Sequence, residues 1–155
     1  MAKARDAVRM TNEEVAAFLQ GALKVQVATI GPHGEPHLTT LFYVLDEGRI
    51  VFWTYGRSQK IANLRRDDRI TCLVEDGRDY VELRGVSISG RARLVEDYDD
   101  VVHIGSRIAT RMADGADLGA YGDDLVRQQA RKRVGVVVEP EKVASWDHRK
   151  MTGSG

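Results

Sequence analysis

Hydroxyl and basic side chains gather where an apolar strand passes through a short turn into a helix. The segment carries, in chain order, Trp53, Thr54, Tyr55, Ser58, Gln59, Lys60 and Asn63. Ser58 is a residue type that caps helix N-termini, and Lys60 would place an ammonium group in the first turn of the helix. Free backbone N–H groups at a helix start, joined by a hydroxyl and an ammonium, bind anions. The spacing therefore predicts an anion site here.

The charge around this segment supports two interpretations. Five basic residues fall within thirteen positions: Arg57, Lys60, Arg65, Arg66 and Arg69. They would strengthen an anion site. The same pattern also fits a capped surface helix whose arginines face water and the neighbouring Asp67 or Asp68. Spacing alone leaves both interpretations open.

Other reactive side chains do not form a known catalytic pattern. His33, His37, His103 and His148 are scattered without the spacing of metal ligands, and the chain has no GxGxxG, Walker A, HExxH or GxSxG motif. The single cysteine, Cys72, excludes an intramolecular disulfide and a cysteine-built zinc site. It alternates with apolar residues, so we expect an inert core thiol and no metal centre.

Composition narrows the functional classes. The chain has 155 residues, with 23 Lys and Arg against 23 Asp and Glu. A zero net charge argues against bulk binding to nucleic acid or to a membrane surface. No run of 18 apolar residues is present, and residues 1–10 lack the apolar core of a secretory signal, so we expect a cytoplasmic protein. The length suits one domain over residues 1–155, with flexible ends at about 1–10 and 152–155.

Hydrophobic periodicity places these residues on a mainly β fold. Thr11 and Glu14 form a capping-box pattern before an amphipathic helix. The period then changes to two, and tight turns separate apolar strands, which indicates an antiparallel meander. We expect helix 12–22, strands 25–30, 36–45 and 49–54, a helix from Ser58 to Arg65 and strand 69–75.

In the next predicted strand the apolar residues change from odd-numbered to even-numbered positions. Val81 and Leu83 stand at odd positions, whereas Val86 and Ile88 stand at even ones, so we place a β-bulge at Arg84-Gly85. A bent, hairpin-connected sheet tends to close. Two helices separated by glycines follow over 96–133, then strand 134–138 and an extended path over 143–146. The prediction is a six- or seven-stranded antiparallel barrel decorated by helices.

The segment from Phe52 to Arg69 reads Phe-x-Thr-x-x-x-Ser-x-Lys-x-x-Asn-Leu-x-x-Asp-x-Arg. It follows a Gly-x-Pro hairpin and an apolar strand, and it resembles the pyridoxamine 5′-phosphate oxidase-like split β-barrel superfamily. The resemblance covers about residues 12–150. It implies the FMN-binding split-barrel type of fold and a homodimer. In such dimers FMN, or the deazaflavin coenzyme F420, lies in a groove at the interface.

The resemblance also implies site residues. Those that match cofactor-binding positions are Thr39, Thr40, Trp53, Thr54, Tyr55, Ser58, Gln59, Lys60 and Asn63. His37 begins the strand beside the same groove. The C-terminal segment Ser145–Met151 is similar to the tail of the F420-dependent branch, so Arg149 is expected to bind cofactor, here or in the partner's site. Its alternative role is a Trp146 anchor on the barrel.

Two differences from the pattern of the FMN-dependent oxidases bear on the identity of the cofactor. Gln59-Lys60 stands where FMN-dependent oxidases carry Arg-Lys, and the arginine and histidine motif for pyridoxal is not matched. The resemblance therefore leans toward F420, whose oligoglutamate tail would find partners in Arg57, Arg65 and Arg66.

The implied function is hydride transfer between F420 and an unsaturated small-molecule substrate. No catalytic side chain is identified; His37, Tyr55, His148 or water could supply a proton. The alternatives are an FMN-dependent oxidoreductase, and a non-catalytic carrier of flavin, F420 or haem.

Overall fold

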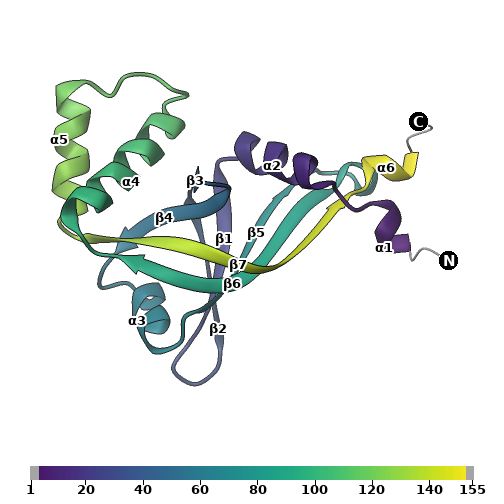
Figure 1. The fold of residues 1–155 in the computed structure, drawn as a ribbon, viewed down its shortest axis with the longest axis horizontal. Helices are drawn as coiled ribbons and strands as arrows, with labels where there is room; N and C mark the ends of the chain where they lie inside the picture. Colours follow the sequence, from purple (N-terminus) through teal and green to yellow (C-terminus); the bar gives the residue numbers. More distant parts are fainter. Residues whose placement is uncertain (1–3, 153–155) are drawn as a thin grey trace.

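The computed structural model describes residues 4–152, which form seven antiparallel strands surrounded by helices (Figure 1). The expected flexible ends fall partly on residues 1–3 and 153–155, which lie outside the described residues. The elements in chain order are α1 (Ala4–Ala7), α2 (Asn12–Gly21), β1 (Lys24–Ile30), β2 (Pro36–Phe42), β3 (Val44–Asp46), β4 (Arg49–Tyr55), α3 (Gln59–Arg66), β5 (Arg69–Asp76), the 3-10 turn η1 (Tyr80–Glu82), β6 (Arg84–Val95), α4 (Tyr98–Met112), α5 (Gly119–Ala130), β7 (Arg133–Asp147) and α6 (Arg149–Thr152).

The strands form one sheet in the order β2-β1-β5-β6-β7-β4-β3. Its two edge strands, β2 and β3, are consecutive in the chain and are separated only by Tyr43. One bent segment therefore joins the two edges, and the sheet curls into a split barrel. This confirms the predicted fold class.

The predicted meander is wrong in its pairing. β1 pairs with β2, and β3 pairs with β4, but β2 and β4 lie near opposite edges. The expected strand 36–45 breaks at Tyr43, whose buried hydroxyl donates a hydrogen bond to the Leu19 carbonyl. Packing against α2 bends the chain at this residue. Each half of the segment consequently joins a different edge.

The β-bulge also lies elsewhere than predicted. From Arg84 to Ser89, β6 pairs with both β5 and β7 without a slip. The irregularity falls between Ser89 and Gly90, opposite Pro140 and Lys142 of β7. The change of parity before Val86 arises instead because Tyr80–Glu82 forms a 3-10 turn rather than a strand.

Two apolar clusters hold the layers together. Inside the barrel, Val25, Val27, Phe52 and Val136 are buried together. Outside it, α4 packs on β3, β4 and β7 through the second cluster, which contains Val44, Val51, Ile104, Ile108 and Val137. The expected helices over 96–133 are α4 and α5, and the structure places them on the outer face of the β4 edge.

The N-terminal helix follows its sequence signal. Thr11 accepts a hydrogen bond from the backbone of Glu14, and the Glu14 side chain accepts one from the backbone of Thr11, so the capping box forms. Within the segment expected to be flexible, Val8 and Met10 are buried. The Asp147 N–H donates to the Val8 carbonyl over 2.7 Å, which ties this segment to β7.

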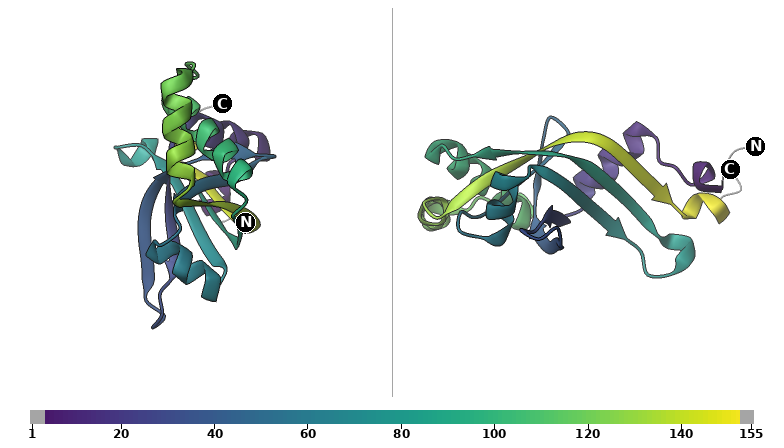
Figure 2. Two further views of the ribbon diagram at one scale, coloured as in Figure 1. Left: turned by 90° about the vertical axis from the view of Figure 1, so that its left-hand side faces the viewer. Right: turned by 90° about the horizontal axis from the view of Figure 1, so that it is seen from below.

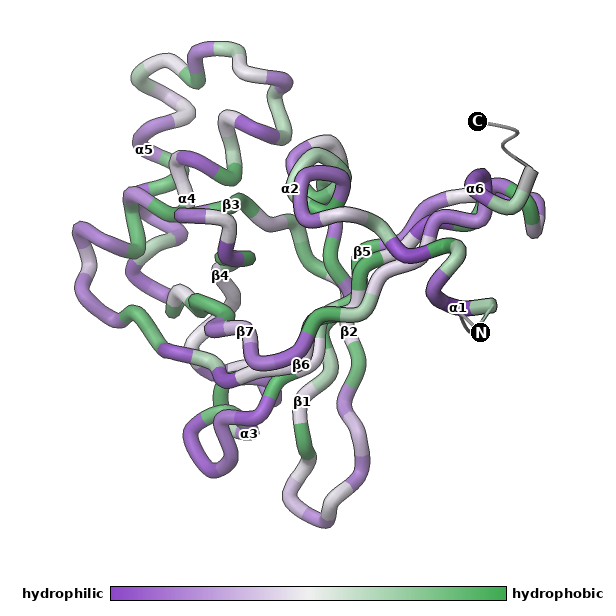
Figure 3. The backbone as a smooth tube through the Cα atoms, turned by 45° about the vertical axis from the view of Figure 1, so that its right-hand side comes forward, coloured by the Kyte–Doolittle hydropathy of each residue, from purple (hydrophilic) through white to green (hydrophobic). Residues whose placement is uncertain are grey.

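The molecule is elongated. Helices α4 and α5 lie at one end, and α6 lies at the other, beyond the long strands β6 and β7 (Figures 1 and 2). Apolar segments follow the strands, whereas α3 and its flanking turn are mainly hydrophilic (Figure 3). Among residues 4–152, no helix is long and apolar enough to cross a membrane.

Candidate functional site

The turn between β4 and α3 is fixed by backbone hydrogen bonds. The Gly56 N–H donates to the Lys132 carbonyl over 2.8 Å, and the Ser58 N–H donates to the Tyr55 carbonyl over 3.0 Å. The Ser58 hydroxyl accepts from the Ile61 N–H over 3.4 Å, so Ser58 caps α3 as predicted. Within the described chain, the N–H groups of Gln59 and Lys60 have no hydrogen-bond acceptor. The start of α3 therefore presents free donors.

Lys60 is the unusual side chain of this helix because only 9% of its surface is exposed. Its ammonium forms no hydrogen bond or ion pair with any other residue of the segment 4–152. Burial lowers the pKa of this ammonium, since a low-dielectric environment disfavours its charged form. A half-desolvated cation beside free N–H groups is suited to an anionic ligand.

Asn63 connects α3 to the barrel. Its amide nitrogen donates to the Thr29 hydroxyl over 3.0 Å, and its amide oxygen accepts from Gln59 over 2.8 Å and from Arg66 over 3.4 Å. Asn63 and Thr29 are both buried. The Asn63 amide is thus bound by the protein, and the residue positions Gln59 at the start of the helix.

The two threonines of β2 point in opposite directions. Thr39 pairs with the buried Val27, whereas Thr40 pairs with Gln26 and is exposed. Neighbouring residues of a strand alternate between its faces, so only Thr39 shares the interior side. The structure does not bring Thr40 together with the start of α3.

His37 lies on the same interior side as Thr39. It stands directly opposite Thr29, the residue that bonds Asn63. His37 Nδ1 and Thr39 Oγ1 are buried and have no hydrogen-bond partner among the described residues. Buried polar atoms without partners are rare in native proteins, so these two atoms mark a position for a further polar group.

The aromatic residues of β4 face away from the interior. Thr54 is buried inside, while Trp53 and Tyr55 point to the side covered by α4. The Arg133 guanidinium stacks on both rings, with its carbon 4.7 Å from the Trp53 centroid and 4.3 Å from the Tyr55 centroid. These contacts place the Arg133 guanidinium next to the turn at Gly56.

Arg133 did not emerge from the sequence. It begins β7 and pairs with Tyr55 across the sheet, 78 positions away in sequence. Its Nε atom is buried and has no hydrogen-bond partner within residues 4–152. The only local signal is a basic run, Arg131-Lys132-Arg133, and nothing in that run indicates an aromatic pair opposite it.

The remaining basic residues near α3 are mostly used by the protein. Arg65 pairs with Glu96, and Arg69 pairs with Asp67 over 2.7 Å, which lowers the pKa of Asp67 to about 2. Arg66 donates to the Ile30 carbonyl. The surface-helix interpretation holds for these arginines. Arg57 is exposed and forms no ion pair within the described chain.

Arg149 lies at the opposite end of the molecule from α3 (Figure 1). Its guanidinium donates to the Asp147 carboxylate over 2.9 and 2.7 Å, and these bonds lower the pKa of Asp147. Nearby, His148 Nδ1 lies 2.7 Å from the Tyr80 carbonyl. One chain therefore does not bring Arg149 or His148 to the start of α3.

Cys72 matches its expected role. It is buried between Ile70 and Val74 on the interior face of β5, and burial raises the pKa of its thiol to about 12. A thiol with such a pKa is not a nucleophile at neutral pH.

The donor set fits a phosphate-bearing cofactor. At the start of α3 it comprises the Ser58 hydroxyl, two free N–H groups and the Lys60 ammonium, and on the interior face of β2 it comprises the buried His37 Nδ1 and Thr39 Oγ1, which lack partners in the described chain. All of these groups can donate a hydrogen bond to phosphate or ribityl oxygens.

Known proteins are similar to this chain over most of its length. A curated relative from Streptomyces rimosus, 5a,11a-dehydrotetracycline/5a,11a-dehydrooxytetracycline reductase, is 30% identical over 140 residues, covering 79% of this chain and 98% of its own. The crystal structure of a conserved hypothetical protein from Mycobacterium tuberculosis is 38% identical, with a TM-score of 0.89 over 99% of this chain and 95% of that one.

A more distant structure, titled F420 Reductase, shares the fold. It is 20% identical, with a TM-score of 0.64 over 83% of this chain and 94% of that one. The family model described as pyridoxamine 5′-phosphate oxidase matches residues 11–147, which include every strand and the complete strand–turn–helix segment. The chain therefore belongs to the pyridoxamine 5′-phosphate oxidase family.

Proposed function

We propose that this protein is an F420-dependent reductase. It would transfer a hydride from the reduced deazaflavin to an unsaturated organic acceptor. The observation that carries the proposal is the Lys60 side chain, which is nearly buried in the first turn of α3 and whose ammonium has no partner in the described chain; the N–H groups of that turn are free as well. The reductase relative from Streptomyces rimosus supports a reductive reaction, and the Gln59-Lys60 pair favours the deazaflavin over FMN.

The residues of the chain would bind and orient the cofactor. Ser58 and Lys60 would hold its phosphate, and a bound phosphate would stabilise the charged form of Lys60. Asn63 would keep Gln59 turned toward the same site through their 2.8 Å hydrogen bond. The deazaflavin supplies the hydride chemistry, while the protein provides position and exclusion of water.

The reduced product also needs a proton. In the same chain, His37 offers a ring nitrogen that lacks a partner, and Tyr55 offers an exposed hydroxyl beside the turn. The third predicted donor, His148, lies against the Tyr80 carbonyl at the far end, so only a second copy could bring it to this site. We therefore favour His37 among the three.

The proposal includes a homodimer with the cofactor groove at its interface. The register places Thr40, Gln26, Leu73, Ser87 and Ala144 in one row across five strands on the outer face of the sheet. No side chain in this row is charged, and Leu38 beside it is 66% exposed. Depletion of charged residues is typical of the core of a protein interface. A second copy on this face would bring Arg149 and the C-terminal tail to the first copy's groove.

The test is a pair of fluorescence titrations, one with F420 and one with FMN. Wild-type protein should bind F420 more tightly than FMN. Lys60→Gln should weaken F420 binding about ten- to hundredfold, the effect of losing one hydrogen bond to a charged group. The matched control is Arg65→Gln on the same helix, because Arg65 is exposed and pairs with Glu96. This control should bind within about twofold of wild type.

Other outcomes of these experiments would indicate a different function. Tighter binding of FMN would identify a flavin oxidoreductase. A bound cofactor that never reduces any acceptor would indicate a carrier, and a red-brown purified protein would identify haem as its cargo. Equal losses in Lys60→Gln and Arg65→Gln would show that the effect is general electrostatics and would contradict the placement of the phosphate.

A further inference from the structure

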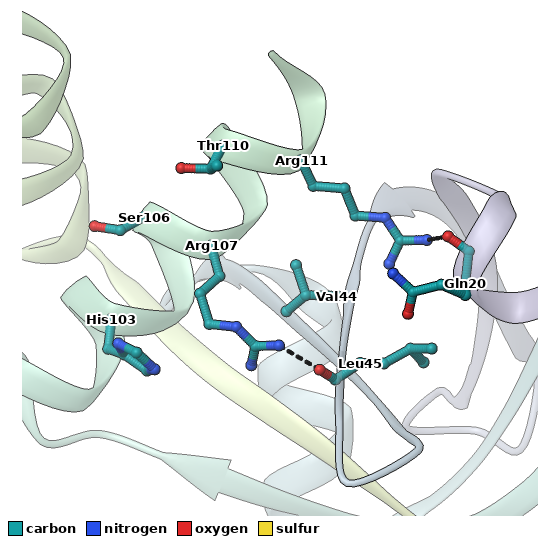
Figure 4. Close-up of a pocket in the computed structure, with 8 residues that line it drawn as sticks. All are labelled: Gln20, Val44, Leu45, His103, Ser106, Arg107, Thr110 and Arg111. Carbon is teal, nitrogen blue, oxygen red and sulfur yellow. Dashed lines mark hydrogen bonds between the residues drawn. The ribbon is translucent and has the colours of Figure 1, made fainter. Parts of the chain in front are cut away.

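A polar pocket lies on α4, away from the strand–turn–helix segment. It has a volume of about 450 Å³ and is bounded by α4, the end of α2 and the start of β3 (Figure 4). Its base is apolar, formed by Val44 and Leu45, and its α4 wall carries Arg107 and Arg111. None of the described residues that line it is Asp or Glu. A pocket of this size suits a small organic molecule.

Arg111 is held rigidly at one side of this pocket. Its guanidinium donates to the Leu19 carbonyl over 2.9 Å and to the Gln20 carbonyl over 2.8 Å, and it also bonds the Ala22 carbonyl. Its carbon lies 4.6 Å from the Tyr43 ring centroid. Arg111 thus satisfies the free carbonyls at the end of α2, and its role is structural.

Arg107 is held in place but keeps donors available. One terminal nitrogen bonds the Leu45 carbonyl, and the side chain is half-buried beside Val44 (Figure 4). Neither Arg107 nor Arg111 forms an ion pair with a residue of the described chain, whereas Arg93 and Arg127 pair with Glu139 and Asp124. Two ordered guanidinium groups one helical turn apart therefore border this pocket without an ion-pair partner in the described chain.

The composition of this pocket points to its ligand. We propose that it binds a small organic carboxylate, with the carboxylate on Arg107 and the apolar body against Val44. A guanidinium matches a carboxylate in a bidentate geometry, and its weak hydration favours a partly buried ion pair. On the other side of Arg107, a hollow of about 190 Å³ is bordered by Asp46 and Asp100. These acidic groups repel a second negative charge and restrict the ligand to one anionic end.

The proposal extends beyond the reductase function because none of the lining residues belongs to the segment from Trp53 to Asn63. The probe pair is benzoate and benzamide, which share size and ring but differ in charge at neutral pH. Nuclear magnetic resonance of the backbone amides of wild-type protein should show benzoate-dependent shifts in residues 103–111, with far smaller shifts for benzamide.

Three variants test the assignment. Arg107→Gln should weaken benzoate binding at least tenfold. His103→Glu should weaken it similarly, since an exposed carboxylate one turn away would pair with Arg107. Arg127→Gln is the matched control on α5, where the arginine already pairs with Asp124, and it should bind as wild type does. Circular dichroism checks that each variant is folded.

Three results would overturn the proposal. They are equal shifts with benzamide, the absence of shifts on α4, and wild-type benzoate affinity in both Arg107→Gln and His103→Glu. The cofactor titrations with Lys60→Gln do not involve this pocket, so either proposal can fail alone.

Discussion

Lys60 differs from the other basic side chains near α3 because its side chain is nearly buried. Arg65 and Arg69 remain in contact with water and pair with carboxylates. Lys60 is nearly buried and has no such partner within residues 4–152, and burial lowers the pKa of its ammonium. Removing part of the water from this ammonium costs free energy, and an anionic ligand would offset that cost.

Because burial lowers the pKa of Lys60, the free energy of unfolding should depend on pH. The unfolded chain holds the Lys60 proton up to about pH 10.5, whereas the folded protein releases it at lower pH, so stability rises as pH increases through that window. Lys60→Met keeps an unbranched side chain, one atom shorter, and removes the charge. We expect the variant to be more stable than wild type at pH 7, and the difference to shrink as pH approaches 10.5.

Urea unfolding of both proteins at several pH values measures this difference. Taking the difference cancels the other lysines and tyrosines, which titrate in the same range in both proteins. A variant that is less stable at pH 7, or a gap that stays constant with pH, would show that the Lys60 ammonium is not desolvated.

Helix α4 approaches the sheet closely at Gly105, the single glycine of this helix. A Cβ atom added at Gly105 would lie 2.3 Å from a ring carbon of Trp53. Arg133 stacks on the same ring, so the position of α4 also affects the aromatic side of the candidate site. Here packing decides where Trp53 points, because its indole has no room to move toward the helix.

Gly105→Ala should therefore destabilise the protein. Alanine is intrinsically better than glycine inside a helix by about 1 kcal/mol, so a net loss can come only from the clash. We expect a decrease of about 1–3 kcal/mol in the free energy of unfolding, together with a shifted Trp53 emission. The control is Gly21→Ala at the end of α2, where an added Cβ meets nothing within 4 Å. A neutral Gly105→Ala would mean that α4 can slide on the sheet.

At the scale of the molecule, the curled sheet separates an interior face from an outer face. The interior carries the apolar cluster and the polar group around Asn63, while the outer face carries the uncharged row that includes Gln26 and Ala144. A single chain leaves this outer face open to water. The proposed dimer would cover it.

A charge on this face should prevent dimer formation. Leu38→Lys places an ammonium at a position that is 66% exposed in one chain, and the cost of burying it at an interface would favour monomers. Light scattering after size-exclusion chromatography should give a dimer mass for wild type and a monomer mass for the variant. The control is Tyr121→Lys on α5, another large side chain that is 79% exposed, and this variant should remain dimeric. A monomeric wild type would refute the dimer.

Local sequence patterns determined those features that depend on neighbouring residues. The Thr11 capping box, the Ser58 cap, the strand alternation around Cys72 and the break between α4 and α5 all follow from chemistry within a few residues. The family motif extended this to the split-barrel class, because that motif lies in one continuous segment.

Tertiary structure decided everything that depends on contacts between distant segments. Packing of Tyr43 on α2 broke the expected strand and sent β2 and β3 to opposite edges, and no local pattern carries that contact. Pairing of β4 with β7 brought Arg133 onto Trp53 and Tyr55. Burial separated Lys60 from the arginines beside it, since a sequence records which side chains are charged but not which of them lose their water.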